Sequence, residues 1–159
     1  MFHNVDAFEK AIAHFYGAPY AVATDCCTHA IELSVYATEA QNIGVPCHTY
    51  ISVPFTMKKL NKDWYWTDHK WQQYNQFENT NIIDAAVYWQ QNGYIAGSIM
   101  CLSFQFKKHL NLGRGGMILT DDADLAQQLK VLRFDGRTQD GTPWYEQQIN
   151  EPGFHYYMT

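Results

Sequence analysis

Apolar residues near the start of the chain recur three or four positions apart, as they do on one face of a helix. The residues of this face are Val5, Phe8, Ile12 and Phe15. Asp6, followed three residues later by Glu9, resembles a capping box and predicts the start of the helix, while Gly17 predicts its end. The chain is therefore predicted to open with an amphipathic helix.

Short β-rich runs alternate with helical runs along most of the remaining chain. Strands are predicted at 20–24, 42–47, 63–67, 81–85, 98–104 and 116–120. Helices are predicted at 28–37 and at 53–60. Asp121 or Asp122 is predicted to cap a further helix over Leu125, Leu129 and Leu132, with Lys130 and Arg133 in its final turn. This alternation predicts an α/β fold with a mostly parallel sheet and helices against its faces.

Composition and charge exclude several classes of function. The chain has 159 residues, of which 47% are apolar and 17% charged, so one core can form without a disulfide or a metal. The net charge of −5 argues against a surface that binds nucleic acid or an anionic membrane. The apolar runs are too short to cross a bilayer, and the first ten residues lack the features of a secretory signal. We therefore expect a cytoplasmic, one-domain protein.

The spacing of cysteines and histidines does not indicate a metal site. Cys26, Cys27, Cys47 and Cys101 form no CxxC pair, and the seven histidines show neither HxxxH nor HExxH spacing. Reduced thiols and scattered histidines are the expected state, and no metal ligand is predicted.

The ends of the predicted strands are the first places to look for chemistry, because ligands of open α/β sheets bind beyond the carboxyl ends of the strands. At 24–28 the first strand meets the N-terminus of a helix, whose free N–H groups and dipole favour a phosphate. Thr28 could add its hydroxyl to such a site. A plain helix cap is the alternative role for Thr28.

Two further strand ends carry ionisable side chains. Asp84 follows Ile82 and Ile83, and a carboxylate in such apolar surroundings requires a partner, either a ligand or a structural Arg or Lys. Lys107 and Lys108 lie between a buried strand and a Gly-rich turn, where a partly desolvated amine can attack a carbonyl. A solvated basic turn is the alternative there.

The segment 103–122, SFQFKKHLNLGRGGMILTDD, resembles a block of the DegT/DnrJ/EryC1/StrS family of sugar aminotransferases, which depend on pyridoxal 5'-phosphate (PLP). That block has Ser-Phe, three variable residues, a lysine, a Gly-rich turn and a strand ending in Thr-Asp. The resemblance places Lys108, five residues after Ser103, on the Schiff-base lysine and Lys107 on a variable position. It extends over nearly the whole chain and implies the large domain of the aspartate aminotransferase fold type, with the second domain absent.

Other segments resemble the rest of the family's cofactor site. Residues 23–30 resemble the phosphate-binding turn, 49–53 the segment whose aromatic residue stacks on the cofactor, and 82–86 the strand whose aspartate pairs with the pyridine nitrogen. Residues 153–158 resemble the segment that reaches the neighbouring subunit's site. The cofactor-binding residues implied are Cys27, Thr28, Tyr50, Asp84, Ser103, Lys108 and His155, and Lys108 is also the implied catalytic residue.

The resemblance implies transfer of an amino group from an amino acid, commonly glutamate, to a keto-sugar nucleotide within a homodimer. Residues 1–135 would form the PLP-binding α/β large domain, and 136–159 an irregular C-terminal segment in the subunit interface. A separate chain would then supply the second domain. The alternative is a noncatalytic or partner-requiring PLP-binding module, that is, a vestigial or split half of an aminotransferase.

Overall fold

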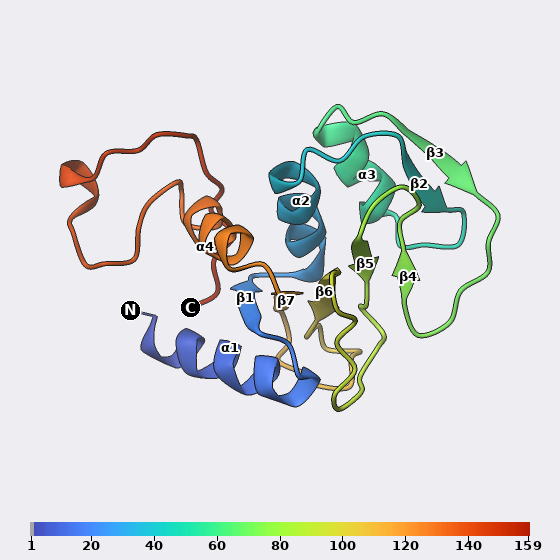
Figure 1. Ribbon diagram of the computed structural model, residues 1–159, viewed down its shortest axis with the longest axis horizontal. Coiled ribbons are helices and arrows are strands. Elements are labelled where there is room, and N and C mark those ends of the chain that lie inside the picture. The colour runs from blue at the N-terminus through green and yellow to red at the C-terminus, as the bar shows by residue number, and fades with distance from the viewer. Residues whose placement is uncertain (1) are drawn as a thin grey trace.

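The computed structural model describes residues 2–159 and shows an α/β fold (Figure 1). Its helices are α1 (His3–Tyr16), α2 (Cys27–Ala37), α3 (Ser52–Lys59) and α4 (Ala123–Leu132), followed by the 3-10 turn η1 (Trp144–Glu146). Its strands are β1 (Tyr20–Thr24), β2 (Ile43–Pro46), β3 (Trp64–Thr67), β4 (Asn75–Gln76), β5 (Ile82–Asp84), β6 (Ile99–Ser103) and β7 (Gly116–Thr120). The predicted strands and helices are confirmed, and β4 is an additional short strand.

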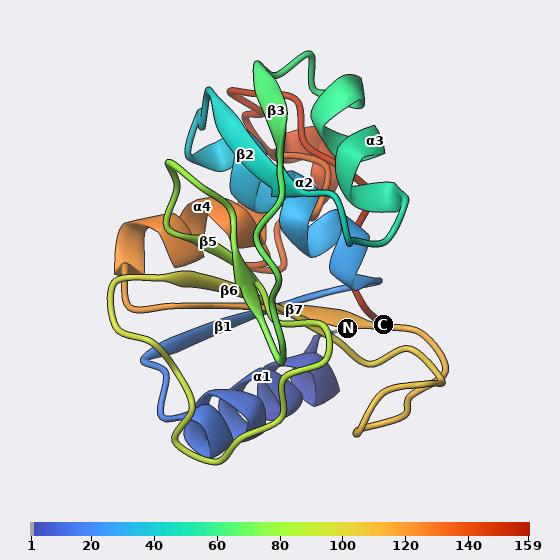
Figure 2. The ribbon, with the colours of Figure 1, turned by 90° about the vertical axis from the view of Figure 1, so that its right-hand side faces the viewer.

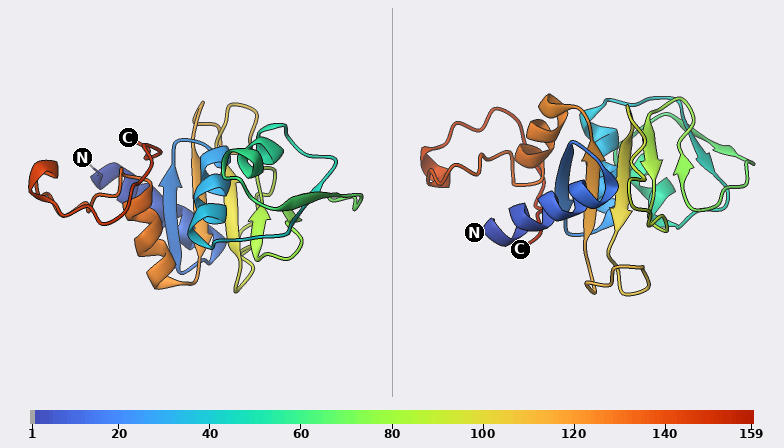
Figure 3. Two further views of the ribbon diagram at one scale, coloured as in Figure 1. Left: turned by 90° about the horizontal axis from the view of Figure 1, so that it is seen from above. Right: turned by 60° about the horizontal axis from the view of Figure 1, so that its bottom comes forward.

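Five strands form one sheet in the order β1-β7-β6-β5-β4, and β2 pairs with β3 in a second, parallel sheet. In the larger sheet only β5 and β6 pair in parallel, so the prediction of a mostly parallel sheet is wrong. The reason is that β7 follows β6 through the loop 104–115, without a crossover helix, and inserts in reverse between β6 and β1. This loop projects from the sheet (Figure 3).

The reversed strand still leaves three strand ends together at one edge of the sheet. Because β1 and β6 both pair antiparallel with β7, they run in the same direction, and β5 runs parallel to β6. Thr24 and Ser103 both pair with Gly116, the first residue of β7. The carboxyl ends of β1, β5 and β6 therefore meet the amino end of β7 at one edge.

Helices cover both faces of the five-stranded sheet, with α1 on one face and α2 and α4 on the other (Figure 2). The alternation along β1 follows from this, since Ala21 and Ala23 pack with α1 and Val22 packs with α2 and α4. A strand buried on both faces is apolar at successive positions whether its neighbours are parallel or antiparallel. The hydrophobic pattern therefore predicted the strands correctly without determining their direction.

The start of α1 differs from the prediction, because the helix begins at His3 and Asp6 does not cap it. Glu9 is instead buried with Arg133, and the two side chains form an ion pair. Glu9 also accepts a hydrogen bond from the Ala23 N–H (2.8 Å), and Arg133 donates to the Ala23 carbonyl (2.6 Å). The pair thus satisfies backbone groups on the outer edge of β1, a role that neither the predicted capping box nor the predicted dipole contact describes.

The predicted C-terminus of α1 and the predicted N-terminus of α4 agree with the structure. Gly17 ends α1 in the left-handed conformation at φ 71°, which favours glycine. Asp122 caps α4 by accepting a hydrogen bond from the Leu125 N–H at 3.0 Å. Within residues 2–159, no helix is long and apolar enough to span a membrane.

The C-terminal segment 136–159 leaves the core and then returns to it (Figure 1). Its final part passes the start of α2, where the Tyr156 carbonyl accepts a hydrogen bond from the Asp25 N–H at 2.8 Å. The Tyr156 ring stacks on His29, with ring centres 3.6 Å apart. The return of this segment closes one side of the turn between β1 and α2.

Candidate active site

A cavity of about 440 Å³ lies at the edge of the sheet where β1, β5 and β6 end. Its walls come from the starts of α2 and α3, the end of β5 and the loop after β6. Six of the seven predicted site residues line it: Cys27, Thr28, Tyr50, Asp84, Ser103 and Lys108. The structure therefore brings together side chains that come from four separate segments of the chain.

The N-terminus of α2 forms the phosphate-sized end of this cavity. Cys26 is the N-cap residue and makes no side-chain capping bond, so the first N–H groups of the helix keep their hydrogen-bonding capacity. Thr28 lies inside the helix, and its hydroxyl bonds to that of Ser52 at 2.8 Å, so the alternative role of Thr28 as a helix cap is not what the structure shows. Positive dipole and free donors make this turn suited to an anion.

Gly116 allows β7 to pack closely against this turn. A Cβ atom at Gly116 would lie 2.4 Å from the Cys26 carbonyl carbon and 2.6 Å from the Cys27 nitrogen, both backbone atoms. The absence of a side chain is therefore a condition for the observed position of the α2 N-terminus.

Asp84 is a buried carboxylate with few partners. Its side chain ends β5, and Oδ1 accepts one hydrogen bond, from the Ala86 N–H at 3.0 Å. Burial raises the pKa of Asp84, against the opposing effects of the Ala86 N–H and the positive charge of Lys108. The ion pairs formed among residues 2–159 do not include Asp84. The alternative of a structural Arg or Lys partner is therefore not what the structure shows.

The two neighbouring lysines differ in their surroundings. Lys108 is half-buried in the turn after β6, and its charge acts on both Asp84 and Cys27. Lys107 is exposed, and its ammonium lies 5.4 Å from the centre of the Phe106 ring. Although both lysines line the cavity, Lys108 is the one whose charge acts on the buried carboxylate.

The other predicted residues of the cavity occupy its wall and rim. The half-buried Ser103 ends β6, and Cys27 donates a weak hydrogen bond from its Sγ to the Cys101 carbonyl at 3.6 Å. Burial raises the pKa of the Cys27 thiol, and the negative charge of the nearby Asp84 raises it further, so this thiol stays neutral. Tyr50 lies at the rim just before α3, with 74% of its surface exposed.

His155 is not brought to the cavity of its own chain. Its Nδ1 lies 3.0 Å from the Asp135 carboxylate, and 71% of its side chain is exposed. His155 forms an isolated β-bridge with Phe134, beyond the end of α4. A role in a partner's site stays a prediction.

A charged cluster at the rim of the cavity was missed by the sequence analysis. Arg114 donates to the Asp25 carboxylate (2.7 Å) and to its backbone carbonyl (3.2 Å), which ties the glycine-rich loop to the turn before α2. Asp25 also binds His29 at 2.5 Å. Two signals were available, namely an arginine between glycines at 113–116 and the four-residue spacing of Asp25 and His29.

The contacts within the rim cluster raise the pKa of His29 and lower that of Asp25. Burial acts to lower the pKa of His29, but hydrogen bonds with Asp25 and Cys26 outweigh it and raise that pKa to about 9. Burial acts to raise the pKa of Asp25, but hydrogen bonds from His29 and Arg114 hold it below its usual value. Ligand atoms of Asp25, Cys26 and His29 lie within 4.8 Å of one another, and a metal ion bound there would have to displace the His29 proton.

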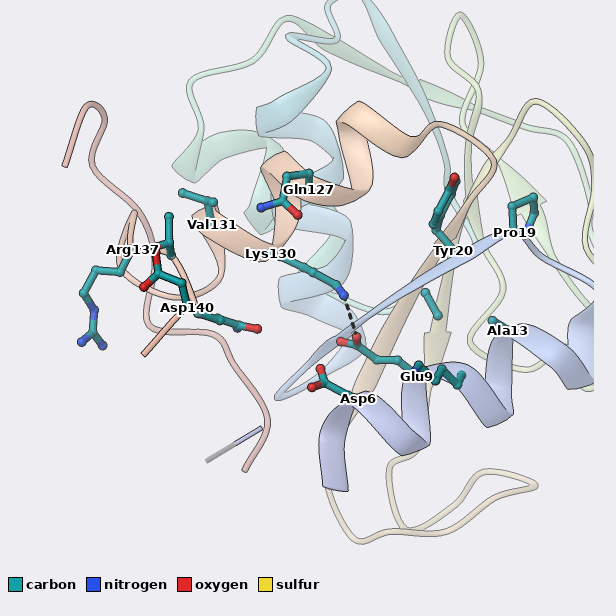
Figure 4. A pocket seen from close by; sticks show the side chains of 14 residues that line it. Asp6, Glu9, Ala13, Pro19, Tyr20, Gln127, Lys130, Val131, Arg137 and Asp140 are labelled. Atoms are coloured by element: carbon teal, nitrogen blue, oxygen red, sulfur yellow. Dashed lines mark hydrogen bonds and ion pairs between the residues drawn. The ribbon is translucent and has the colours of Figure 1, made fainter. Parts of the chain in front are cut away.

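A second, larger cavity of about 740 Å³ lies between α1, α4 and residues 137–140 (Figure 4). There Lys130 extends from α4 to Glu9 of α1, at 3.2 Å. Arg137 pairs with Asp135 at 3.0 Å. Lys130 and Arg137 thus have carboxylate partners, whereas Lys108 and Asp84 of the smaller cavity form no ion pair within residues 2–159. The smaller cavity is therefore the better candidate for chemistry.

The described fold and cavity define a class, namely α/β proteins that share the fold of the aminotransferases. The chain belongs to the DegT/DnrJ/EryC1/StrS aminotransferase family, whose model matches residues 1–87 and 82–159. The sheet, the cavity and the sequence block around Lys108 are therefore features of a member of this family.

Individual proteins show the same likeness. The spore coat polysaccharide biosynthesis protein SpsC of Bacillus subtilis is 27% identical over 98% of this chain and 53% of its own length. The structure of AtS13 from Actinomadura melliaura matches with a TM-score of 0.82 and 19% identity, over 97% of this chain and 56% of that one. Spr1654 from Streptococcus pneumoniae, in its PLP-form, matches with a TM-score of 0.77 and 16% identity, over 96% and 55%. The chain spans about half the length of the relatives it matches.

Proposed function

We propose that this chain is the PLP-binding half of a sugar aminotransferase. The observation that carries the proposal is that Asp84 and Lys108 line one cavity together with the uncapped N-terminus of α2. Family membership supports the reaction class, and a PLP-form among the similar structures supports the cofactor. In this proposal residues 1–135 form the cofactor-binding domain, and residues 136–159 contribute to a subunit interface.

The chemistry of the cavity residues fits PLP. An anionic phosphate matches the free N–H groups at the start of α2, with hydroxyls of Thr28 and Ser103 at the same edge of the sheet. A protonated pyridine nitrogen matches Asp84, a buried carboxylate that has no ion-pair partner in residues 2–159. An aldehyde matches the amine of Lys108, and Tyr50 would cover one face of the ring.

Each residue would have a defined part in the reaction. When bound, PLP supplies an electron sink for the carbon from which a proton is removed. Asp84 would hold the proton on the ring nitrogen that makes this sink effective. Lys108 would act as general base and accept, at its Nζ, a proton from the α-carbon of the amino donor. It would then act as general acid and return this proton to the cofactor carbon next to the ring.

The substrates and the assembly belong to the same proposal. The donor would be glutamate and the acceptor a keto-sugar nucleotide, as the family resemblance implies, and the polysaccharide role in the name of SpsC supports a sugar. A homodimer would bring His155 of one subunit toward the cavity of the other. The high exposure of both His155 and Tyr50 supports a site that a second subunit completes.

Cofactor attachment tests the proposal directly. The purified chain, incubated with PLP, should gain visible absorbance that borohydride bleaches, and mass spectrometry should locate the added mass on Lys108. Lys108→Ala should abolish both signals, whereas Lys107→Ala should retain them because Lys107 is exposed. Attachment to Lys107, or to no lysine, would refute the assignment.

The open rim of the cavity favours a second candidate function, a PLP-binding module that is inactive alone. Tyr50, which is expected to cover the cofactor, is 74% exposed at the rim of the cavity. Transamination of keto-sugar nucleotides by glutamate would be assayed for the chain alone and with a separate chain carrying the family's second domain. Cofactor binding without activity in both assays would favour the module.

A further inference from the structure

The short strand β4 places a buried amide next to Asp84. Asn75 of β4 is directly opposite Asp84 of β5 in an antiparallel pair. Opposite residues in such a pair project from the same face, with Cβ atoms about 4.5–5.5 Å apart. Asn75 is only 2% exposed, and within residues 2–159 its Nδ2 has no hydrogen-bond partner.

A histidine determines which end of this amide is free. The Thr67 hydroxyl lies 2.9 Å from His69 Nδ1, and His69 Nε2 is hydrogen-bonded to Asn75 Oδ1. With the Asn75 amide oxygen placed toward His69, the matching tautomer has Nε2 donating to this oxygen and Thr67 donating to Nδ1. The amide oxygen is therefore occupied, and the NH₂ group is the end without a partner.

Asp84 has the complementary feature, an acceptor oxygen without a donor. Its Oδ1 accepts from the Ala86 N–H, and the hydrogen bonds within the described chain leave Oδ2 without a donor. A buried carboxylate needs donors to remain ionised, and a buried NH₂ group needs an acceptor. The two unmet requirements belong to residues that face each other across one strand pair.

We propose that Asn75 is a positioning residue for Asp84. With the cofactor bound, Nδ2 would come within hydrogen-bonding distance of Asp84 Oδ2, a contact that the two side chains do not make in the structure as described. The carboxylate would then accept the ring N–H of the cofactor from the cavity side. His69 and Thr67 hold the amide in the orientation that makes this donation available. The inference rests on the proposed function, because the ring nitrogen is the group toward which Asp84 is held.

The test compares the affinity of the apoprotein for PLP and for 1-deaza-PLP, in which a C–H replaces the ring nitrogen. We expect the wild-type chain to prefer PLP by about tenfold or more, the magnitude of one hydrogen bond to a charged group. Asn75→Leu and the smaller Asn75→Ala should each reduce this preference severalfold, and Asp84→Ala should abolish it. Gln76→Leu is the matched control, because Gln76 is the exposed neighbour in β4.

The outcomes separate the two proposals. An unchanged preference in whichever Asn75 variants fold would overturn the positioning role and leave the proposed function intact. Equal wild-type affinity for the two compounds would overturn the contact between Asp84 and the ring nitrogen, and the inference with it. A wild-type chain that binds neither compound would refute the proposed function before any variant is made.

Discussion

Two buried acids, Glu9 and Asp84, show how the same chemical group serves different purposes in this molecule. Glu9 pairs with the fully buried Arg133, contacts Lys130 at 3.2 Å and accepts from the Ala23 N–H. Asp84 is nearly as buried, yet it accepts one backbone hydrogen bond and forms no ion pair with the residues described. A fully partnered acid stabilises the fold, whereas an acid with few partners is available to a ligand.

Removal of Glu9 should have the largest effect on stability. Glu9→Ala leaves the Arg133 guanidinium buried without its carboxylate, and we expect the free energy of unfolding to fall by about 3–5 kcal/mol. Urea unfolding followed by circular dichroism measures this loss. Glu9→Leu combined with Arg133→Met should recover much of it, and a loss below about 1 kcal/mol in the single variant would contradict the comparison.

Asp84→Asn should have the opposite effect on stability. Burial raises the pKa of Asp84 above its value in the unfolded chain, so ionised Asp84 destabilises the folded state at neutral pH. We expect the variant to be unchanged or more stable by roughly 1 kcal/mol, while its affinity for PLP falls by about tenfold or more. Urea unfolding and absorbance titration with PLP measure the two effects. A large loss of stability would show that Asp84, like Glu9, stabilises the fold, and would contradict the comparison.

An exposed acid provides the intermediate case. Asp122 caps α4 through the Leu125 N–H, and Asp122→Ala should lower the free energy of unfolding by about 1 kcal/mol without altering PLP affinity. Thermal unfolding with a cofactor titration tests both statements. Asp122→Asn, which keeps a capping oxygen, is the control that should stay close to the wild type.

The rim cluster should make the stability of the chain depend on pH. The pKa of His29 is raised to about 9, above its value of about 6.5 in an unfolded chain. Its contribution to stability is therefore fully present below about pH 6.5 and is lost as the pH rises through about 9. Unfolding measured from pH 6 to 10 should show this loss in the wild type and a smaller one in His29→Gln. Equal slopes would show that the pair with Asp25 does not stabilise the chain.

Much of the cavity was predictable because its residues lie in short segments with local signals. Lys108 follows Ser103 at a defined spacing before a Gly-rich turn, and Asp84 ends an apolar run. The structure places both in one cavity with Thr28. The partners of Glu9 and Asn75 had no such signal, because Arg133 is 124 residues from Glu9 and β4 is only two residues long.

The amino-acid sequence by itself determined where strands and helices form and which polar residues follow the strands, since both depend on neighbours within a few positions. Only the tertiary structure decided that β7 runs in reverse, that Glu9 pairs with Arg133, and that Asn75 lies opposite Asp84. The physical reason is that strands buried on both faces have the same apolar pattern in either direction. Contacts between distant residues are selected by packing and by the requirement that buried charges and donors find partners.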